Sequence, residues 1–153
     1  MPLRTSTARP DLDTYFLRML KLVASRSTCA RRAVGAIIVD AAGHVLSTGY
    51  NGVPSKMVHC IQIPCQGAKD PSGDSSRCLA VHAELNAIQQ CFRLDLAHVM
   101  YCSCTPCFTC AKSIMNTSIW KIVCQEGYTD LVGVNLLRDN GRRVEVKTGY
   151  AEE

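Results

Sequence analysis

The stretches CLAVHAELNAI, residues 78–88, and TPCFTC, residues 105–110, decide how this sequence folds and what it binds. Each opens a predicted helix with metal-binding side chains near its start. Cys107 and Cys110 are one helical turn apart, so both sulfurs face the same way, and a helix N-terminus favours thiolates. His82 supplies an imidazole from the other helix. Since a catalytic zinc site uses three protein ligands and leaves a fourth position for water, the sequence predicts a zinc site made by His82, Cys107 and Cys110.

Glu84 has a different predicted role beside this site. It is too close to His82 in sequence to add much as a fourth ligand, but it is placed to touch a water in the open position. Zinc lowers the pKa of such a water towards ~7, and a neighbouring carboxylate can carry the proton away. A lone C-x-x-C is more typical of a structural zinc half-site or a redox motif. Pro106 directly before it, with H-x-E upstream, favours the catalytic interpretation.

Outward from these stretches, apolar periodicity and turn residues predict alternating helices and strands. The expected elements are a helix over 11–25, strands over 34–39 and 45–50, a helix over 80–92, a strand over 98–103, a helix over 107–117, a strand over 119–124, a helix over 130–140 and a strand over 143–146. The first two strands form a hairpin. The last three follow one another through helical crossovers, so we expect an α/β fold with a partly parallel sheet and helices on both faces.

Length and charge narrow the class of protein. The chain has 153 residues, the size of one domain. We expect a single domain over 11–148, with tails over 1–10 and 149–153. No apolar run approaches the ~20 residues of a membrane helix, and the start of the chain lacks the apolar segment of a signal peptide, so we expect a cytoplasmic protein that binds no membrane. The net charge is +4 without a basic stripe, which argues against a polymeric nucleic acid as partner.

Ten cysteines in a chain without a secretory signal favour metal binding over disulfides. Residues 51–76 form a predicted loop rich in Gly and Pro, and a loop this long is usually functional or held by something. Four cysteines lie in or beside it: Cys29, Cys60, Cys65 and Cys78. A closed Cys₄ zinc site would fix the loop without a core of its own. His59 is a rival ligand, and the alternative is a group of reduced, buried thiols.

The sequence resembles the deoxycytidylate (dCMP) deaminases of the zinc-dependent cytidine/deoxycytidylate deaminase superfamily. The combination H-x-E…P-C-x-x-C is the signature of zinc-dependent nucleobase deaminases. Residues 78–88 resemble their active-site helix, and GYNGVP over 49–54 resembles their GYNG-x-P loop. RSTCARRAVGA over 26–36 resembles the R-S-T-C-x-R-x-x-V-G-A segment of the phage and bacterial late-competence branch. Plain cytidine deaminases have C-x-E instead, and tRNA adenosine deaminases lack the GYNG loop.

The resemblance implies a fold and a reaction. The fold would be the three-layer α/β/α cytidine-deaminase-like fold with a mixed five-stranded sheet. The reaction would be hydrolytic deamination of dCMP to dUMP with release of ammonia, which supplies dUMP for thymidylate synthesis. Glu84 would take a proton from water, deliver it to N3 of cytosine and later help to protonate the leaving amino group. Several phage and bacterial relatives have an extra structural zinc ion in the region of the long loop, so the resemblance also implies a second zinc ion there.

The resemblance also implies a set of substrate contacts. The Ala83 backbone and the Thr105 carbonyl would help to hold the base, Asn51 would bind the deoxyribose 3′-OH, and Tyr128 would cover the nucleotide. The alternatives are a turn residue for Asn51, because Asn-Gly is a strong turn signal, and a buried strand-end aromatic for Tyr128. The remaining two contacts concern the phosphate, for which Arg26 and Arg31 are candidates. Solvated surface is the alternative for both arginines.

Other properties stay open at this point. Cys104 is smaller than the residue that relatives often have there, so a pocket with more room near cytosine C5 could admit 5-methyl-dCMP; different core packing is the alternative. Deamination of dCTP and a non-catalytic zinc-stabilised binding module are rival functions, although a structural module has no use for Glu84. The resemblance further implies a homo-oligomer, expected to be a hexamer, with dCTP and dTTP as effectors.

Overall fold

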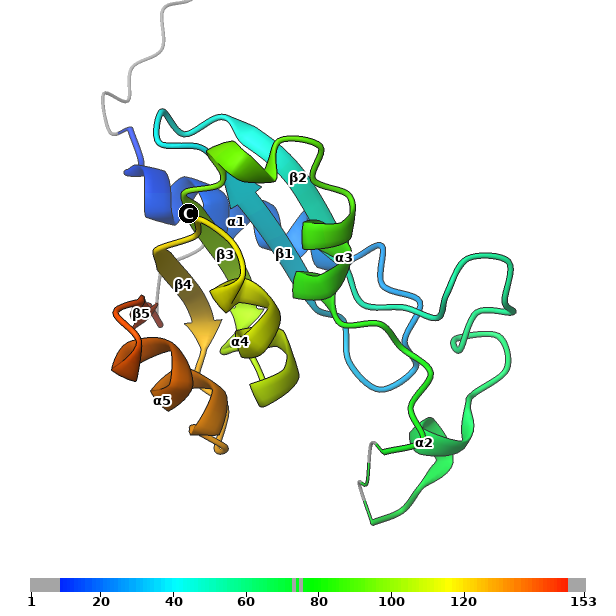
Figure 1. Ribbon diagram of the computed structural model, residues 1–153. Coiled ribbons are helices and arrows are strands. Elements are labelled where there is room, and N and C mark those ends of the chain that lie inside the picture. The colour runs from blue at the N-terminus through cyan, green and yellow to red at the C-terminus, as the bar shows by residue number, and fades with distance from the viewer. Residues whose placement is uncertain (1–8, 73, 75, 149–153) are drawn as a thin grey trace, which may run out of the picture.

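The computed structural model describes residues 9–72, 74 and 76–148 (Figure 1). Most of the predicted tails, 1–8 and 149–153, lie outside the described residues. The helices and strands are α1 (Leu12–Ala24), β1 (Gly35–Val39), β2 (Val45–Tyr50), α2 (Gln66–Lys69), α3 (Ala83–Gln89), the 3₁₀ turn η1 (Leu94–Leu96), β3 (Val99–Cys104), α4 (Phe108–Met115), β4 (Lys121–Glu126), α5 (Val132–Asp139) and β5 (Arg143–Val146).

The five strands form one mixed sheet in the order β2-β1-β3-β4-β5. β1 runs antiparallel to both β2 and β3, whereas β3, β4 and β5 are parallel. α1 covers one face, and α3, α4 and α5 cover the other (Figure 1). The expected three-layer α/β/α fold with a mixed five-stranded sheet is therefore confirmed. Within the described residues, no helix has the length and apolar character needed to cross a membrane.

β1 shows why the sheet is central to the core. All five of its residues are buried, because both faces of the strand are covered. Side chains alternate between faces along a strand, so Ala36 and Ile38 pack with α3, α4 and α5, whereas Ile37 and Val39 pack with α1. This explains why β1 has an unbroken apolar sequence instead of an alternating one.

Several predicted boundaries were wrong. The helix expected over 80–92 is shorter, because Val81 forms an extended bridge with Gly52 and His82 is the N-cap residue of α3. Beyond Gln89 the chain continues as a turn and η1. The third and fourth strands start one and two residues later than expected, and the short helix α2 inside the long loop was not predicted. Strands 45–50 and 143–146 were predicted correctly.

Gly49 fixes the position of the active-site helix. A Cβ atom at Gly49 would lie 2.3 Å from the Ala83 carbonyl oxygen and 2.4 Å from the Ala87 nitrogen, so α3 packs against the backbone of β2 itself. Two side chains add hydrogen bonds across this contact: Ser47 Oγ donates to the Ala87 carbonyl at 2.7 Å, and Asn86 Nδ2 donates to the Tyr50 carbonyl at 2.8 Å. The start of α3 is therefore held rigidly over the sheet.

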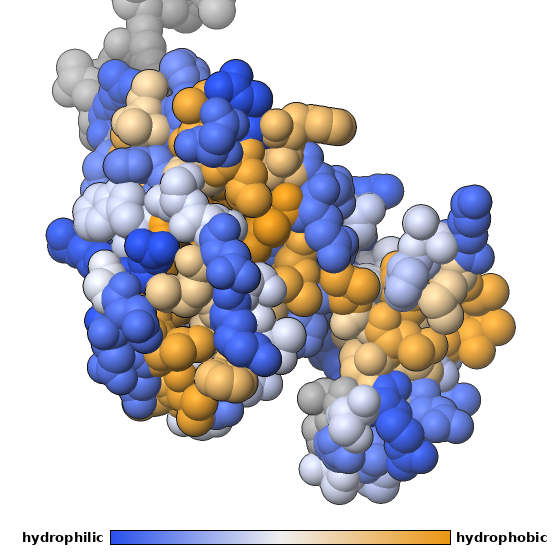
Figure 2. Space-filling view, viewed as in Figure 1, coloured by the Kyte–Doolittle hydropathy of each residue, from blue (hydrophilic) through white to orange (hydrophobic). Residues whose placement is uncertain are grey.

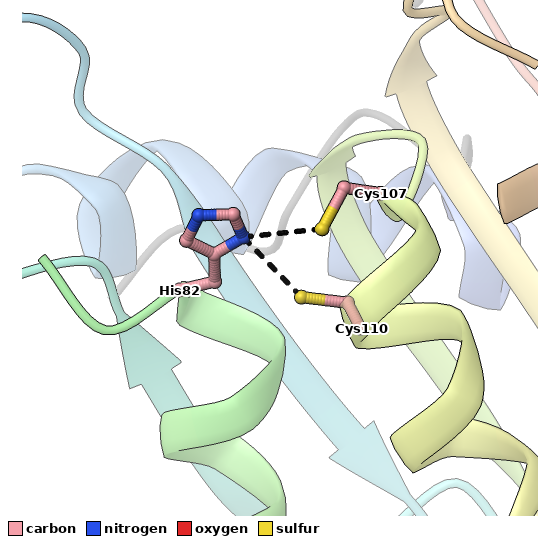
Figure 3. A group of neighbouring side chains, drawn as sticks. All are labelled: His82, Cys107 and Cys110. Atoms are coloured by element: carbon pink, nitrogen blue, oxygen red, sulfur yellow. Dashed lines mark hydrogen bonds between the residues drawn. The ribbon is translucent and has the colours of Figure 1, made fainter. Parts of the chain in front are cut away.

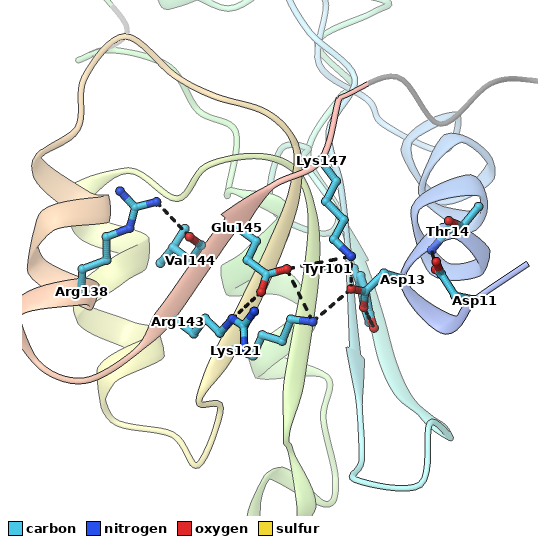
Figure 4. Close-up of polar contacts among 10 residues, drawn as sticks. All are labelled: Asp11, Asp13, Thr14, Tyr101, Lys121, Arg138, Arg143, Val144, Glu145 and Lys147. Carbon is cyan, nitrogen blue, oxygen red and sulfur yellow. Dashed lines mark hydrogen bonds and ion pairs between the residues drawn. The ribbon is translucent and has the colours of Figure 1, made fainter.

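A partly buried ion cluster fixes α1 on the opposite face (Figure 4). The Asp13 carboxylate accepts hydrogen bonds from the Tyr101 hydroxyl at 2.7 Å, from Lys121 at 3.0 Å and from Lys147 at 2.5 Å. Burial alone would raise the pKa of Asp13, but the hydrogen bonds from Lys147, Tyr101 and Lys121 lower it to about 2. The cluster joins the first turn of α1 to β3, β4 and the segment after β5.

Candidate active site

The starts of α3 and α4 bring three metal-binding side chains together (Figure 3). His82 is the N-cap residue of α3, Cys107 is the N-cap residue of α4, and Cys110 follows in the first turn of α4. His82 Nδ1 lies 3.5 Å from Cys107 Sγ and 3.3 Å from Cys110 Sγ, and all three ligand atoms are within 4.8 Å of one another. Ligands of a tetrahedral zinc ion are about 3.6 Å apart, so the geometry fits zinc.

The electrostatics of the two thiols also fit a cation. Cys110 and His82 lower the pKa of Cys107 to about 3 through hydrogen bonds to its sulfur. In contrast, the hydrogen bond with Cys107 and burial raise the pKa of Cys110. The pair thus holds one negative charge easily, and a second thiolate forms readily only when a cation joins the site.

Glu84 lies in the first turn of α3 with only 3% of its surface exposed. Burial raises the pKa of this carboxyl, and the charge of His82 partly offsets the effect. The carboxyl also forms a hydrogen bond with the Cys110 side chain. A buried carboxyl group with a raised pKa accepts a proton more readily than an exposed one, which suits it to general acid–base catalysis beside a metal site.

Cys104 lies beside Glu84 at the end of β3. The residue is 9% exposed, and burial together with the Glu84 charge raises the pKa of its thiol to about 12. The next residue, Thr105, is buried and leads into Pro106 and the α4 cysteines. Cys104 packs in one core cluster with Ala83 of α3 and Ala111 of α4, so it lies on the face of the sheet that carries the metal-binding set. The room that its small side chain leaves near cytosine C5 stays a prediction.

Asn51 connects the segment before β1 to the loop after β2. Its side-chain oxygen accepts from the Val34 N–H at 2.8 Å and from Ser27 Oγ at 2.6 Å, and its Nδ2 donates to the Arg32 carbonyl at 2.8 Å. Only 7% of the residue is exposed. These bonds give Asn51 a structural role. The amide nitrogen carries two hydrogens, and the bond to the Arg32 carbonyl uses one of them. Donation of the other to a sugar hydroxyl stays a prediction.

Tyr128 lies after β4 with 52% of its surface exposed, so the alternative of a buried strand-end aromatic was wrong. Its N–H donates to Thr105 Oγ1 at 2.8 Å. The Arg32 guanidinium lies 5.6 Å from the centre of the Tyr128 ring and 2.6 Å from the Glu126 carboxylate. Arg32 and Glu126 were missed by sequence reasoning, because the motif that singled out Arg31 leaves its neighbour unspecified.

The two arginines proposed for phosphate lie in different surroundings. Arg31 Nη1 donates to the Gly67 carbonyl at 2.9 Å and so connects the segment before β1 to α2. Arg26 is exposed just beyond the end of α1. Contact of either side chain with a phosphate stays a prediction.

The four cysteines of the long loop are neighbours. The Cys65 N–H donates to Cys60 Sγ at 3.4 Å, and the Arg31 N–H donates to Cys29 Sγ at 3.5 Å. Hydrogen bonds from backbone N–H groups, with that of Leu79 the strongest, and from neighbouring thiols lower the pKa of Cys65 to about 7. Burial raises the pKa of Cys78, and Cys65 and Cys29 add to this. In the described part of the chain, however, only His82, Cys107 and Cys110 form a set of three within 4.8 Å.

The fold and the site define an α/β protein with a histidine–dicysteine metal site and a buried carboxyl beside it. Residues 10–126 match the family model described as the cytidine and deoxycytidylate deaminase zinc-binding region. The chain therefore belongs to the cytidine and deoxycytidylate deaminase family. The matched region contains the three metal-binding residues and Glu84, whereas Tyr128 lies just beyond it.

Individual relatives agree with this assignment. The deoxycytidylate deaminase of Mycobacterium phage D29 is 39% identical over 76% of this chain and 95% of its own length. The deoxycytidylate deaminase of Saccharomyces cerevisiae is 38% identical over 78% of this chain, which corresponds to only 39% of the yeast protein. The dCMP deaminase of cyanophage S-TIM5 in apo form matches with a TM-score of 0.70 and 26% identity, over 92% of this chain and 100% of its own.

Proposed function

We propose that this protein is an enzyme that deaminates dCMP hydrolytically to dUMP and ammonia, and that it supplies dUMP for thymidylate synthesis. The observation that carries the proposal is the buried Glu84 carboxyl beside the set of His82, Cys107 and Cys110. A purely structural zinc site has no use for such a carboxyl. The deoxycytidylate deaminase of phage D29, nearly all of which aligns with this chain, supports the substrate.

The chain's own residues account for the proton transfers. When bound to the three ligands, zinc would supply Lewis acidity that lowers the pKa of a water towards ~7. Glu84 would take a proton from the attacking water and carry it to N3 of cytosine. The water oxygen would then bond to C4, and Glu84 would take the second proton from that oxygen and pass it to the amino group. The C4–N bond would break as the C4 carbonyl forms, so that ammonia leaves and Glu84 is again a carboxylate. The first N–H groups of a helix have no partner within it, so the Ala83 N–H at the start of α3 can hold the base together with the Thr105 carbonyl.

A related substrate, 5-methyl-dCMP, is the second candidate, because the small Cys104 side chain, which is close enough to Glu84 to experience its charge, would leave room for a methyl group at C5. The substrate is decided by incubating the purified protein with dCMP, 5-methyl-dCMP, dCTP, deoxycytidine and cytidine and measuring ammonia. We expect dCMP to have the highest kcat/KM. If 5-methyl-dCMP or dCTP has the highest kcat/KM, the proposed substrate is wrong and the proposed deamination reaction still holds. If none of these compounds releases ammonia, the proposed deaminase activity is wrong.

We also propose a second, structural zinc ion held by Cys29, Cys60, Cys65 and Cys78. Hydrogen bonds from backbone N–H groups reach the sulfurs of these cysteines, and such bonds stabilise thiolates. A zinc ion would draw the four sulfurs closer together and would order the long loop, which has few apolar contacts of its own. His59 stays the rival ligand.

Metal analysis tests this second site. We expect two zinc ions per chain in the parent and one in a Cys60→Ser variant, because the loss of one thiolate opens the site. The half-buried Cys91, outside the set, provides the matched control, and Cys91→Ser should keep both ions. A parent with one zinc ion, whose four loop thiols react freely in the native protein, would contradict the second site.

The protein is further proposed to form a homo-hexamer that responds to dCTP and dTTP in the cytoplasm. Large apolar residues are exposed on the part of the chain around α2 (Figure 2): Met57, Val58, Ile61, Ile63 and Leu79. Such a surface is typical of an interface. None of the ten cysteines forms a disulfide, which agrees with a reducing compartment.

Light scattering at micromolar protein should give the mass of a hexamer. Ile61→Asp should reduce that mass, because a charge would be buried in the interface, whereas the substitution Lys69→Asp on α2 should not. A monomeric parent would refute the assembly, and a dCMP saturation curve unchanged by dCTP or dTTP would refute the regulation.

A further inference from the structure

Arg32 lies where three loops around the site meet. Its carbonyl accepts a hydrogen bond from Asn51 Nδ2 at 2.8 Å, in the loop after β2. Its guanidinium reaches the end of β4, where it lies 2.6 Å from the Glu126 carboxylate and 5.6 Å from the centre of the Tyr128 ring. Arg32 thus connects the segment before β1 to the loop after β2 and to the loop after β4.

The contact with Arg32 matters because the backbone alone does not orient the Tyr128 ring. The Tyr128 N–H is fixed by Thr105 Oγ1 at 2.8 Å, which holds the chain beside the residues that lead to Cys107. The side chain is about half exposed, so its rotamer depends on what touches the ring. One contact on the ring is the Arg32 guanidinium, 5.6 Å from the ring centre. A guanidinium over an aromatic face is an attractive arrangement.

Glu126 in turn orients Arg32. The carboxylate and the guanidinium are both well exposed, and an exposed ion pair contributes little to stability. The pair is therefore poorly suited to stabilising the fold but well suited to fixing the plane of the guanidinium. Glu126 is two residues before Tyr128, and its carbonyl accepts from the Thr105 N–H at 3.0 Å. The group that orients Arg32 and the ring that Arg32 holds thus belong to one short segment.

The catalytic side of the site is close by. The Cys104 thiol experiences the charges of both Glu84 and Arg32, the first raising and the second lowering its pKa. Cys104 is also the register partner of Glu126 across β3 and β4. The Arg32 guanidinium therefore lies on the same side of the sheet end as the buried Glu84 carboxyl.

We propose that Arg32 is a positioning residue that holds the Tyr128 ring over the substrate base, with Glu126 orienting the guanidinium. The inference rests on the proposed function, in which Tyr128 covers the nucleotide. Without Arg32 the ring must lose rotational freedom when substrate binds. Arg32→Ala should therefore raise KM with kcat little changed. Because the ring covers the base, the loss should be the same, about fivefold, for dCMP and for deoxycytidine.

A double-mutant cycle on kcat/KM tests this coupling. We expect Arg32→Ala to cost about fivefold in the parent and in Tyr128→Phe, which keeps the ring, but less than twofold in Tyr128→Ala. Glu126→Gln should reproduce part of the loss, and Arg32→Lys should rescue part of it. Arg93→Ala is the matched control, because Arg93 forms a similar exposed ion pair with Asp95. Thermal melting should be unchanged in all of these variants.

Two results would overturn the role of Arg32 in an active enzyme. Equal losses in the parent and in Tyr128→Ala would show that Arg32 does not act through the ring. A loss with dCMP but none with deoxycytidine would show that Arg32 binds the phosphate instead. The parent's own turnover separates these outcomes from failure of the proposed function: a parent that deaminates neither compound would overturn both proposals.

Discussion

Glu84→Gln is expected to lower kcat for dCMP by about 10²–10⁴-fold. The amide keeps the size of the buried carboxyl but cannot accept and return a proton. Since Glu84 is proposed to act in several proton steps, both attack on C4 and departure of ammonia should slow. KM should change little, because the base contacts proposed for Ala83 and Thr105 come from the backbone and remain.

The loss should be catalytic and not structural. Zinc content and thermal melting should match those of the parent, since Glu84 lies outside the set of three ligands. Asp95→Asn is the matched control, because Asp95 is an exposed carboxylate paired with Arg93. A Glu84→Gln enzyme with activity within about tenfold of the parent would remove Glu84 from the mechanism.

Loss of the substrate phosphate is expected to lower kcat/KM by roughly 10- to 100-fold, because a charge-assisted contact contributes roughly 1.5–3 kcal/mol. Deoxycytidine should therefore be a much poorer substrate than dCMP. Part of the loss should fall on kcat, since binding energy from a remote group helps to orient the reacting base. Arg26→Ala or Arg31→Ala should reproduce much of this loss with dCMP.

Deoxycytidine turnover is the internal control for these variants. Arg31 also holds the Gly67 carbonyl, so its removal could disturb the loop around α2. A disturbed loop would slow both substrates, whereas a lost phosphate contact would slow only dCMP. If the parent deaminates deoxycytidine as efficiently as dCMP, the substrate is a nucleoside and the monophosphate assignment is wrong.

The metal site could be predicted because its geometry is local. Cys107 and Cys110 are one turn apart, and each helix start needs only a few neighbouring residues to form. Strands 45–50 and 143–146 were also predicted from patterns within the segments themselves. The three protein ligands that a catalytic zinc site uses, with the H-x-E…P-C-x-x-C signature, joined His82 to the cysteine pair, which periodicity alone could not do.

Features that depend on contacts between distant segments were not predictable. The start of α3 is set by the bridge between Val81 and Gly52, which overrides the helical spacing of the preceding residues. The Arg32 side chain is defined by Glu126 and Tyr128, almost a hundred positions away along the chain. No sequence pattern specifies such a contact, because it forms only after the sheet has brought the two loops together.

Incubation with dCMP in water enriched in oxygen-18 tests the proposed reaction most directly. Hydrolytic deamination takes the new C4 oxygen from solvent, so mass spectrometry should find dUMP with one heavy oxygen, formed together with an equal amount of ammonia. The Glu84→Gln variant, with its zinc retained, should form almost no labelled dUMP in the same time. Absence of labelled dUMP from the zinc-loaded parent would contradict deamination of dCMP at the site formed by His82, Glu84, Cys107 and Cys110.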